Sequence, residues 1–367
     1  MSRTGRVGVG VIGAGVISDQ YLENLTTFPD LDVRFVADLD LVRAKTQAQK
    51  YGVPGSGSVE DLLADPAIEI VVNLTIPAVH VQVARRALAA GKNVWTEKPF
   101  ALDRETGQAL LAEAARLGLR VATAPDTFLG AGLQTALRLI EGGAVGTPLT
   151  ALALMQSPGP DSWHPNPEFL FQAGGGPLFD VGPYYLTALV QTFGPVARVT
   201  AAASTARPVR VIGSGPRAGT SFDVTVPSHH GALLEFESGA SAQTIFSFQS
   251  HRSRGLIEVS GSTGTLAYPD PNHFDGDCVI FDGIDRDGRR VPPTGSMSSR
   301  GTGVAELAQA IRAGRPERAN GALACHVLDT MVSITESAER GESVAVESSF
   351  TKAPPVPEHW DPKAASL

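Results

Sequence analysis

A glycine-rich turn between an apolar run and an amphipathic stretch constrains the fold of this chain more than any other feature. The run Val7-Gly8-Val9-Gly10-Val11-Ile12 leads directly into Gly13-Ala14-Gly15-Val16-Ile17-Ser18. In that context the first glycine allows a tight turn and the second lets a ligand approach the backbone, while the small Ser18 lets the next helix pack closely. The start of such a helix offers free N–H groups and partial positive charge to a phosphate. The motif therefore predicts a dinucleotide site. Its expected contacts are Gly13, Gly15, Val16 and Ile17.

The sequence up to about residue 125 alternates short Val/Ile-rich runs with Ala/Leu-rich amphipathic stretches. This alternation is typical of βαβ units around a parallel sheet. We therefore expect an α/β fold that begins with a doubly wound Rossmann domain over residues 1–126. The expected strands cover 6–12, 33–37, 69–74, 93–96 and 119–124. The expected helices cover 15–27, 40–51, 78–90 and 103–117.

Beyond Pro125 the pattern changes, because alternating strands now follow one another without intervening helices. Such a run predicts an α+β domain over residues 127–367 with one large, mostly antiparallel sheet. The expected strands cover 149–156, 196–203, 231–237, 241–248 and 256–260, and the expected helices against the sheet cover 130–142, 181–193, 303–313 and 324–339. We expect long loops at 205–230 and 269–300. The tail after Pro354 is expected to wrap the surface or fray.

Composition excludes several classes of protein. The chain has 367 residues, 43% of them hydrophobic, and no apolar run reaches the ~18 residues that span a bilayer. The short polar lead before Val7 leaves no room for a secretory leader, so we expect a cytoplasmic protein. A formal charge of −8, with 30 basic residues spread along the chain, argues against nucleic-acid binding. The two cysteines lie far apart, and His229, His230 and His251 lack partners at ligand spacing, so no metal site is expected.

Asp38 ends the expected strand 33–37, about 20 residues past Ser18. At that distance a carboxylate reaches the adenosine ribose of a bound dinucleotide. Its negative charge would repel a 2′-phosphate, which favours NAD over NADP, although Arg43 one helical turn on could partly compensate. A second role for Asp38 is the N-cap of the helix expected at 40–51, and both roles can coexist.

Another strand ends at the same edge of the expected sheet, in Asn73-Leu74-Thr75-Ile76-Pro77. Ligands of open parallel sheets bind beyond the carboxyl ends of the strands, so we expect Thr75 and Pro77 to line the nicotinamide side of the site. His80 begins the following helix. It either contacts the cofactor or positions a neighbouring group.

Glu97-Lys98-Pro99 closes the apolar stretch 93–96 and fixes a cation where a strand ends. The residue before a proline is driven into extended geometry, so Lys98 cannot simply join a following helix. We expect Glu97 and Lys98 to face the cofactor. The alternative for Lys98 is an ordinary surface lysine.

A glycine triplet, 174–176, introduces the second dense motif. Its backbone could approach a ligand closely. Asp180 and Tyr184 follow at a spacing of four, so on a helix they share one face. An acid and a phenol would then face the same cleft, whereas the alternatives are an N-cap for Asp180 and a core aromatic for Tyr184. Tyr185 and Asp126 are weaker candidates.

Trp163 and His164 precede the glycine triplet in an expected loop. An aromatic face suits the apolar face of a sugar, and an imidazole can bind hydroxyls, so this pair indicates a pocket wall. The alternative is a packed loop tryptophan beside a solvated histidine.

With these motifs the chain resembles the Gfo/Idh/MocA family of NAD(P)-dependent oxidoreductases, which includes inositol dehydrogenases and glucose–fructose oxidoreductase. The resemblance rests on the glycine turn at 13–18, Asp38, Glu97-Lys98-Pro99, the segment 174–182 and Gly261-x-x-Gly264-Thr265-Leu266. It implies that the second domain has an open sheet that mediates homodimers or homotetramers. In the family, the lysine matching Lys98 and an Asp-x-x-x-His pair carry the chemistry. This chain has Tyr184 at the histidine position, as in the glucose–fructose oxidoreductase and dihydrodiol dehydrogenase branches.

The resulting prediction is a dehydrogenase that transfers a hydride from a secondary alcohol of a sugar, inositol or related polyol to NAD. Tyrosine, with a pKa near 10, is a poor base at neutral pH, but an ammonium group within about 4–6 Å would favour the phenolate. Lys98 and Tyr184 would titrate as a pair, and which of them takes the proton stays open. The expected catalytic residues are Lys98, Asp180 and Tyr184, and the expected substrate contacts are Lys98, Trp163, His164, Asp180 and Tyr184.

Two other functions fit the sequence. One is a carbonyl- or diol-directed NAD(P) reductase of the same family. The other is a non-catalytic NAD(P)-binding regulator, because a fold alone does not establish activity. A regulator is expected to lose the lysine, so the presence of Lys98 with Asp180 and Tyr184 argues against it.

Overall fold

The computed structural model describes residues 4–283, 286–297 and 299–367. The chain divides into two compact units, which are described separately. The first consists of Met1–Ala131, Thr294–Cys325 and Ala353–Leu367, and the second of Gly132–Pro293 and His326–Lys352. The division expected at 126/127 stays a prediction. The contacts of the chain add two later segments, 294–325 and 353–367, to the N-terminal unit.

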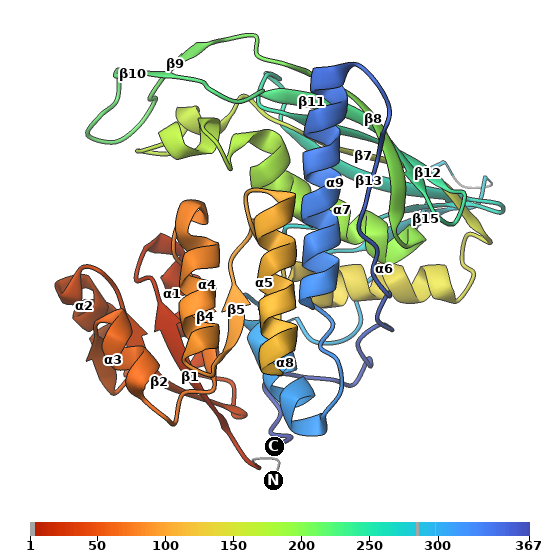
Figure 1. Cartoon of the computed structure of the whole chain (residues 1–367). Helices are drawn as coiled ribbons and strands as arrows, with labels where there is room; N and C mark the ends of the chain where they lie inside the picture. Colours follow the sequence, from red (N-terminus) through yellow and green to blue (C-terminus); the bar gives the residue numbers. More distant parts are fainter. Residues whose placement is uncertain (1–3, 284–285, 298) are drawn as a thin grey trace. The chain divides into compact units, whose positions relative to one another are not determined.

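A six-stranded parallel sheet forms the first unit, in the order β3-β2-β1-β4-β5-β6 (Figure 1). All six residues of β1 are buried, as expected for a central strand that helices cover on both faces. The order reverses between β1 and β4, which is where such sheets bind ligands. The strands are β1 (Val7–Ile12), β2 (Leu31–Ala37), β3 (Gly55–Gly57), β4 (Ile70–Asn73), β5 (Asn93–Thr96) and β6 (Val121–Thr123). The helices are α1 (Val16–Leu25), α2 (Leu41–Tyr51), α3 (Val59–Ala64), α4 (His80–Ala89) and α5 (Arg104–Leu117).

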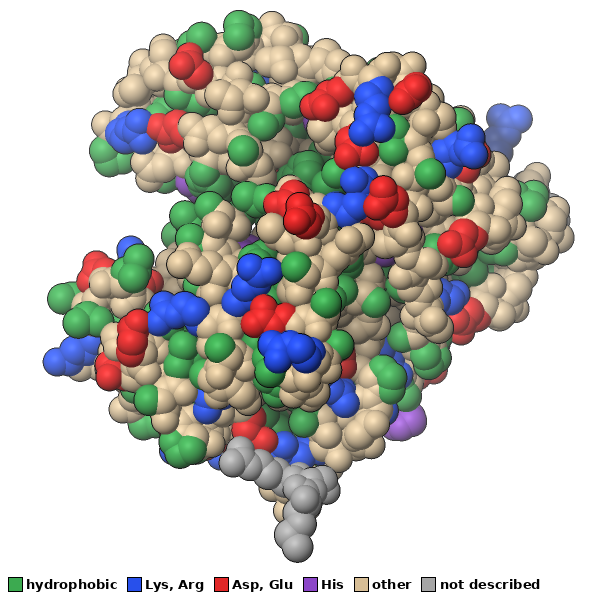
Figure 2. Space-filling view, viewed as in Figure 1, with side chains coloured by type: hydrophobic (Ala, Val, Ile, Leu, Met, Phe, Trp, Pro, Cys, Tyr) green, Lys and Arg blue, Asp and Glu red, His purple; other side chains and the backbone are tan. Residues whose placement is uncertain are grey.

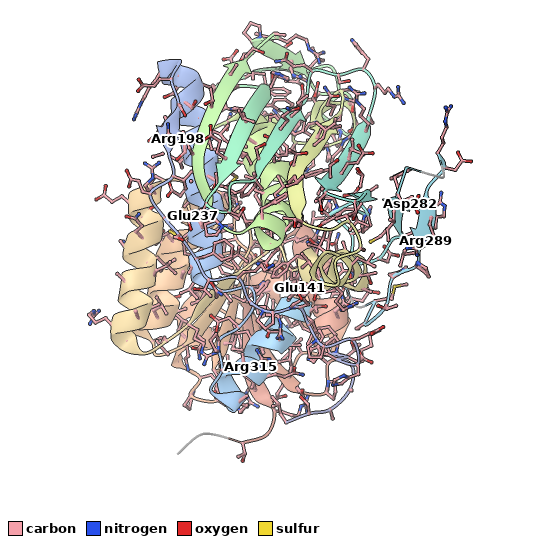
Figure 3. All side chains as sticks on the ribbon, turned by 90° about the vertical axis from the view of Figure 1, so that its right-hand side faces the viewer. Glu141, Arg198, Glu237, Asp282, Arg289 and Arg315 are labelled. Carbon is pink, nitrogen blue, oxygen red and sulfur yellow. The ribbon has the colours of Figure 1, made fainter. Side chains whose placement is uncertain are left out.

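The second unit is built on a nine-stranded sheet, in the order β16-β15-β14-β13-β7-β12-β11-β8-β17. Its neighbouring strands are antiparallel except for β7 and β12, which are parallel. Figure 3 labels Arg198 on β8 and Arg289 on β16, near opposite edges of this sheet. The strands are β7 (Pro148–Gln156), β8 (Val196–Ser204), β11 (His229–Phe236), β12 (Ser241–Ser247), β13 (Arg254–Gly261), β14 (Thr265–Ala267), β15 (Cys278–Phe281), β16 (Arg289–Val291) and β17 (Val344–Ala345).

Helix α7 (Gly176–Phe193) packs on β7, β11 and β12, and almost all of its length is buried. Helices α6 (Ala131–Glu141) and α9 (Gly321–Arg340) correspond to the helices expected at 130–142 and 324–339. The expected fold class is therefore confirmed: a Rossmann-type parallel sheet precedes a large, mostly antiparallel sheet.

One expectation about a helix is wrong. The helix expected at 303–313 is present as α8 (Thr302–Ala313), but it belongs to the first unit rather than to the antiparallel sheet. Its start lies against Trp95 of β5, since a Cβ added to Gly303 would collide with that indole. An amphipathic helix carries no mark of which sheet it will cover, so chain order misled the prediction.

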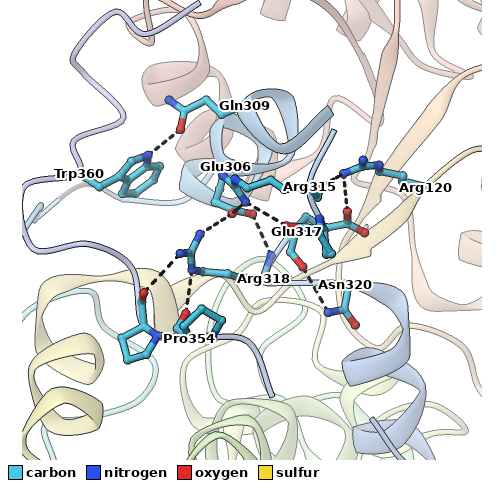
Figure 4. Close-up of polar contacts among 11 residues, drawn as sticks. Arg120, Glu306, Gln309, Arg315, Glu317, Arg318, Asn320, Pro354 and Trp360 are labelled. Atoms are coloured by element: carbon cyan, nitrogen blue, oxygen red, sulfur yellow. Dashed lines mark hydrogen bonds and ion pairs between the residues drawn. The ribbon is translucent and has the colours of Figure 1, made fainter. Parts of the chain in front are cut away.

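The tail after Pro354 also packs on the first unit (Figure 4). Trp360 donates its indole N–H to Gln309 of α8, and Arg318 donates to the carbonyl of Pro354. Arg318 and Arg315 share the carboxylate of Glu306, whose side chain is 1% exposed. At the far end of the tail, Ser366 donates twice to the buried carboxylate of Asp30. The tail therefore wraps the surface rather than fraying.

Both expected long loops contain short strands. The segment 205–230 forms a two-stranded ribbon, β9 (Val209–Val211) with β10 (Ser221–Asp223), and it ends in β11. The segment 269–300 contains β15 and β16, while residues 284, 285 and 298 lie outside the described residues. The strands were missed because they are three or four residues long and lie among Gly, Pro and Ser.

Candidate active site

The glycine turn has the geometry that a bound pyrophosphate needs. Gly13 has a φ of +104°, and a Cβ there would lie 2.7 Å from the carbonyl group of Leu74. A Cβ on Gly15 would meet nothing within 4 Å, so open space faces the start of α1. Ser18 is fully buried, and its hydroxyl donates to the Gly15 carbonyl. Gly13 is thus required by the turn itself, whereas Gly15 leaves room for a ligand.

Asp38 is held by three donors. Its carboxylate accepts from the Ala14 amide at 2.7 Å, the Asp40 amide at 2.9 Å and the Arg43 guanidinium at 2.6 Å. Burial alone would raise the pKa of Asp38, but the hydrogen bonds from Arg43 and the two amides lower it below its usual value. The N-cap of α2 is Asp40, whose side chain accepts from the Val42 and Arg43 amides. The alternative role of Asp38 as that N-cap is therefore wrong.

A cavity of about 520 Å³ lies at this edge of the first unit. The exposed apolar side chains of Leu39 and Ile76 border it, and Arg86 of α4 adds a cation. Four predicted or suggested site residues line it: Gly13, Gly15, Asp38 and Thr75. The turn, the Asp38 carboxylate and the apolar walls together fit a dinucleotide. Val16 and Ile17 begin α1 beside this cavity, and their contacts to a pyrophosphate stay predictions.

Asn73 and His80 connect the ends of neighbouring strands. Asn73 accepts from the Thr75 hydroxyl at 2.6 Å and donates to the His80 carbonyl at 3.0 Å. The His80 ring is 1% exposed, with Nδ1 2.9 Å from the Pro99 carbonyl and Nε2 2.9 Å from the Thr75 carbonyl. The ring therefore ties the segment after β4 to the segment after β5, which favours the positioning role of His80. Pro77 begins the single turn before α4.

Glu97 holds the backbone of Lys98. Its carboxylate accepts from the Tyr21 hydroxyl at 2.7 Å and from the Lys98 amide at 3.0 Å. Tyr21 in turn accepts from the Trp95 indole at 3.2 Å, and burial raises the pKa of its phenol, so it stays protonated. Lys98 itself is partly buried directly after β5, and the Lys98–Pro99 peptide is cis. Sequence reasoning missed Tyr21, because nothing in α1 marks one buried phenol as a partner of a residue 76 positions away.

Asp126 is a buried carboxylate three residues after β6, the last strand of the first unit's sheet. One of its oxygens accepts from the Gly301 amide at 2.9 Å and the Gly303 amide at 3.1 Å, at the start of α8. Burial raises the pKa of Asp126 to about 6, with a smaller contribution from Glu97, while Arg300 and the two amides oppose the shift. This residue was only a weak candidate in the sequence, and its observed contacts are those of a remote helix cap.

In the second unit, the glycine triplet has a packing explanation. A Cβ on Gly175 would lie 2.5 Å from the Phe169 carbonyl oxygen, and Gly176 has a φ of +75°. Close approach of the chain to itself therefore requires these glycines, whether or not a ligand also approaches them. Asp180, partly buried, and Tyr184, 6% exposed, follow on α7 one turn apart. The expected spacing on one helix is present.

Tyr185 differs from its neighbour Tyr184. Its ring packs edge-on against Phe246. A Cβ added to Gly255 would lie 2.6 Å from the Tyr185 hydroxyl oxygen, so this hydroxyl packs closely against Gly255. Burial raises the pKa of Tyr185 well above that of a free phenol, with a smaller contribution from Asp270. Tyr185 is therefore a core residue, packed between α7 and the sheet, rather than a proton acceptor.

Trp163 and His164 lie on a loop of the second unit. Trp163 is 66% exposed and packs edge-on against His164, which packs edge-on against Phe169. His164 Nδ1 accepts from the Asn166 amide at 3.0 Å. An exposed tryptophan with a fixed imidazole is available to a ligand, so the alternative of a packed loop tryptophan is disfavoured.

The predicted residues thus form two groups, one in each unit. Gly13, Gly15, Asp38, Thr75, His80, Glu97 and Lys98 belong to the first unit, and Trp163, His164, Asp180 and Tyr184 belong to the second. The pairing of Lys98 with Tyr184 joins the two groups and stays a prediction. Among the described residues, no cluster of three or more His, Cys, Asp or Glu side chains could hold a metal ion. None of the described helices is long and apolar enough to cross a membrane. Acidic and basic side chains are interspersed on the face shown in Figure 2.

Comparison with known proteins identifies both parts of the chain. Residues 7–124 match the model of the oxidoreductase family with an NAD-binding Rossmann fold, and residues 133–267 match the model of the GFO/IDH/MocA C-terminal domain. An uncharacterised oxidoreductase of Rhizobium meliloti, ORF334, is 27% identical over 349 residues, which cover 91% of this chain and 98% of that protein. The trans-1,2-dihydrobenzene-1,2-diol dehydrogenase of Bos taurus is 28% identical over 265 residues, which cover 71% of this chain and 74% of that enzyme.

Among solved structures, a levoglucosan dehydrogenase in complex with NADH and L-sorbose has a TM-score of 0.81 to this chain at 21% identity. The match covers 94% of this chain and all of that one, and it supports the fold. The first unit therefore has the NAD-binding Rossmann fold that its motifs predict. The chain belongs to the Gfo/Idh/MocA family of oxidoreductases.

Proposed function

We propose that this protein is an NAD-dependent dehydrogenase that oxidises a secondary hydroxyl of a sugar, inositol or related polyol. The observation that carries the proposal is Lys98, which lies two residues after β5 at the sheet edge that bears the glycine turn and Asp38. Its main chain is held by the buried Glu97 carboxylate. A lysine at the sheet edge that binds the dinucleotide suits the oxidation of an alcohol.

The reaction removes a hydride from the carbinol carbon and a proton from its hydroxyl, leaving a ketone. NAD, when bound, supplies the hydride acceptor. We assign the proton to the Lys98 and Tyr184 couple, since a positioned base contributes ~10²–10⁴ in rate. An ammonium near the phenol would favour its ionised form and polarise the forming carbonyl. Asp180, one turn before Tyr184 on α7, would hold the substrate hydroxyl or Lys98 in place.

The names of relatives support the substrate class. A relative that matches over 71% of this chain is a dehydrogenase of a cyclic diol, and a similar structure is a levoglucosan dehydrogenase crystallised with L-sorbose. Both names describe oxidation of hydroxyl groups on a ring. The diol relative also keeps the carbonyl- or diol-directed reductase as the second candidate, which differs from the first in physiological direction.

The test is a panel of polyols, inositols and cyclic sugars added to the purified protein with NAD, with NADH absorbance as the readout. We expect turnover of at least one substrate, and Lys98→Met should reduce it by roughly 10²–10⁴ while NADH binding, followed by fluorescence, persists. Lys50→Met is the matched control, because Lys50 is an exposed lysine of α2 that pairs with Asp19.

Two outcomes would overturn the proposal. Near wild-type turnover by Lys98→Met would show that Lys98 takes no part in the proton transfer. Binding of NAD without turnover across the whole panel would favour a regulator. A cytoplasmic location, and a homodimer or homotetramer through the second unit's sheet, stay predictions.

A further inference from the structure

We propose that Arg210, on the β9–β10 ribbon, is a positioning residue that holds the loop 157–172 in the conformation that selects the substrate. This inference rests on the proposed function, because the loop carries Trp163 and His164, the expected contacts to a polyol. The ribbon and the loop both belong to the second unit.

The Arg210 side chain is fully buried and makes four contacts, three of them to the loop 157–172. Its Nη1 donates to the Pro158 carbonyl and to the Asp161 carboxylate, both at 2.7 Å. Its Nη2 donates to the Phe248 carbonyl just beyond β12. The guanidinium also lies over the Phe171 ring, 4.8 Å from the ring centroid. A planar, multivalent cation can make these contacts at once, whereas a lysine cannot.

Arg210 is an expensive residue to bury at this position. Burial lowers its pKa, which Asp161 opposes and the nearby Arg207 reinforces. Among the described residues, its buried Nε has no hydrogen-bond partner. The surrounding cluster is apolar, formed by Leu170, Phe171 and Phe248. Apolar packing alone could fill such a place at lower cost, so the arginine is better explained by the loop geometry that it imposes.

The rest of the ribbon holds the same loop along its length. The Gly213 amide donates to the Asp161 carbonyl at 2.7 Å, and the Ser214 hydroxyl donates to the Trp163 carbonyl at 2.6 Å. Arg217 forms an ion pair with Glu168 farther along the loop. The Trp163 backbone is therefore fixed from the ribbon side while its indole remains exposed.

Glycines at the contact show how closely the two segments approach. Gly159 has a φ of +113°, and a Cβ there would lie 2.5 Å from Arg210 Nη1. A Cβ on Gly213 would lie 2.9 Å from the Ser162 carbonyl oxygen. The loop and the ribbon could not approach each other this closely if Gly159 or Gly213 were a larger residue.

The Arg210 cluster also reaches helix α7. Val181, the residue after Asp180, packs against the core of Leu170, Phe171 and Phe248. A change at Arg210 would therefore affect both the loop that carries Trp163 and the turn that carries Asp180. Because both are expected substrate contacts, substrate binding should respond more than cofactor binding.

The test compares Arg210→Met and Asp161→Asn with the control Arg198→Gln. Arg198 is an exposed residue of β8 in the same unit, outside the loop 157–172 and the ribbon. Asp161→Asn keeps the size of the side chain and serves as the second variant should Arg210→Met fail to fold. Hydrogen exchange of residues 157–172 is measured first, because it needs no substrate. We expect faster exchange in both test variants and unchanged exchange in the control.

Steady-state kinetics with the polyol identified from the panel then separates positioning from general damage. We expect the KM for the polyol to rise by roughly 10- to 100-fold, with a smaller change in kcat and an unchanged KM for NAD. Unchanged exchange in both test variants would show that Arg210 does not hold the loop 157–172. Faster exchange with an unchanged polyol KM overturns the positioning role. If the wild-type protein oxidises nothing in the panel, the proposed function fails, and the role of Arg210 in substrate selection fails with it. Hydrogen exchange still decides whether Arg210 holds the loop 157–172.

Discussion

The cofactor edge of the first unit and the loop 157–172 of the second, which we propose to contact the substrate, are ordered by different means. At the cofactor edge, Asp38, Asn73 and Glu97 each end or directly follow a strand, and main-chain amides within two residues donate to all three carboxylate or amide groups. The loop 157–172 lies between β7 and α7 without a strand of its own, and its Asp161 is held by Arg210, 49 residues away. A parallel sheet arrays functional groups at its edge by construction, whereas a loop must obtain its order from distant contacts.

The largest expected effect concerns the second region, where two adjacent tyrosines allow a matched pair of variants. Tyr184→Phe should lower kcat by roughly 10²–10⁴, because it removes the phenol assigned to proton transfer. Tyr185→Phe should change kcat little, since burial raises the pKa of Tyr185 and its hydroxyl packs against Gly255. Steady-state assays of both variants with the polyol substrate make the comparison. Equal losses in the two would show that α7 contributes packing rather than a proton acceptor.

The next effect concerns stability in the first unit. Asp126 has a pKa of about 6 in the folded protein, against about 3.9 unfolded, so the native state binds its proton more tightly. This residue therefore lowers the free energy of unfolding as pH rises from about 4 to about 6, by about 3 kcal/mol, and adds no further change above that range. Asp126→Asn should remove this dependence, because an amide does not titrate.

Urea unfolding of wild type and Asp126→Asn across that pH range measures the difference. The variant's stability relative to wild type should increase from about pH 4 to about pH 6 and then stay level. A difference that is constant with pH would mean that the Asp126 carboxylate ionises as readily in the folded protein as in the unfolded chain.

The same contrast explains what could be predicted from the sequence. Five of the first unit's six strands, its helices α1, α2, α4 and α5, and the places of Asp38 and Lys98 follow from periodicity and from the rule that ligands bind where parallel strands end. The short elements β3 and α3 were not expected. The large, mostly antiparallel sheet was also expected from five of its nine strands, which alternate polar and apolar residues.

Residues that act across long separations could not be predicted. Tyr21, Arg210 and the partners of Asp126 are recognisable only once the fold brings them together, over separations of 49 to 177 residues. The surfaces that helix α8 and the C-terminal tail cover could not be predicted for the same reason. The sequence of such a segment does not indicate which part of the protein it will pack against. Local patterns thus predict the elements and the strand-end groups, and long-range contacts decide the rest.

The smallest expected effect compares the two charges that face each other at the cofactor edge. Asp38→Ala should raise the KM for NAD by roughly 10- to 100-fold, since a charged hydrogen bond contributes about 1.5–3 kcal/mol. Arg43→Ala should leave the KM for NAD nearly unchanged but increase the preference for NAD over NADP, because Arg43 neutralises the Asp38 carboxylate at 2.6 Å. Kinetics with both cofactors measure the preference. If Arg43→Ala instead makes NADP a better cofactor, the guanidinium does not mask Asp38, and the carboxylate alone does not set the preference for NAD.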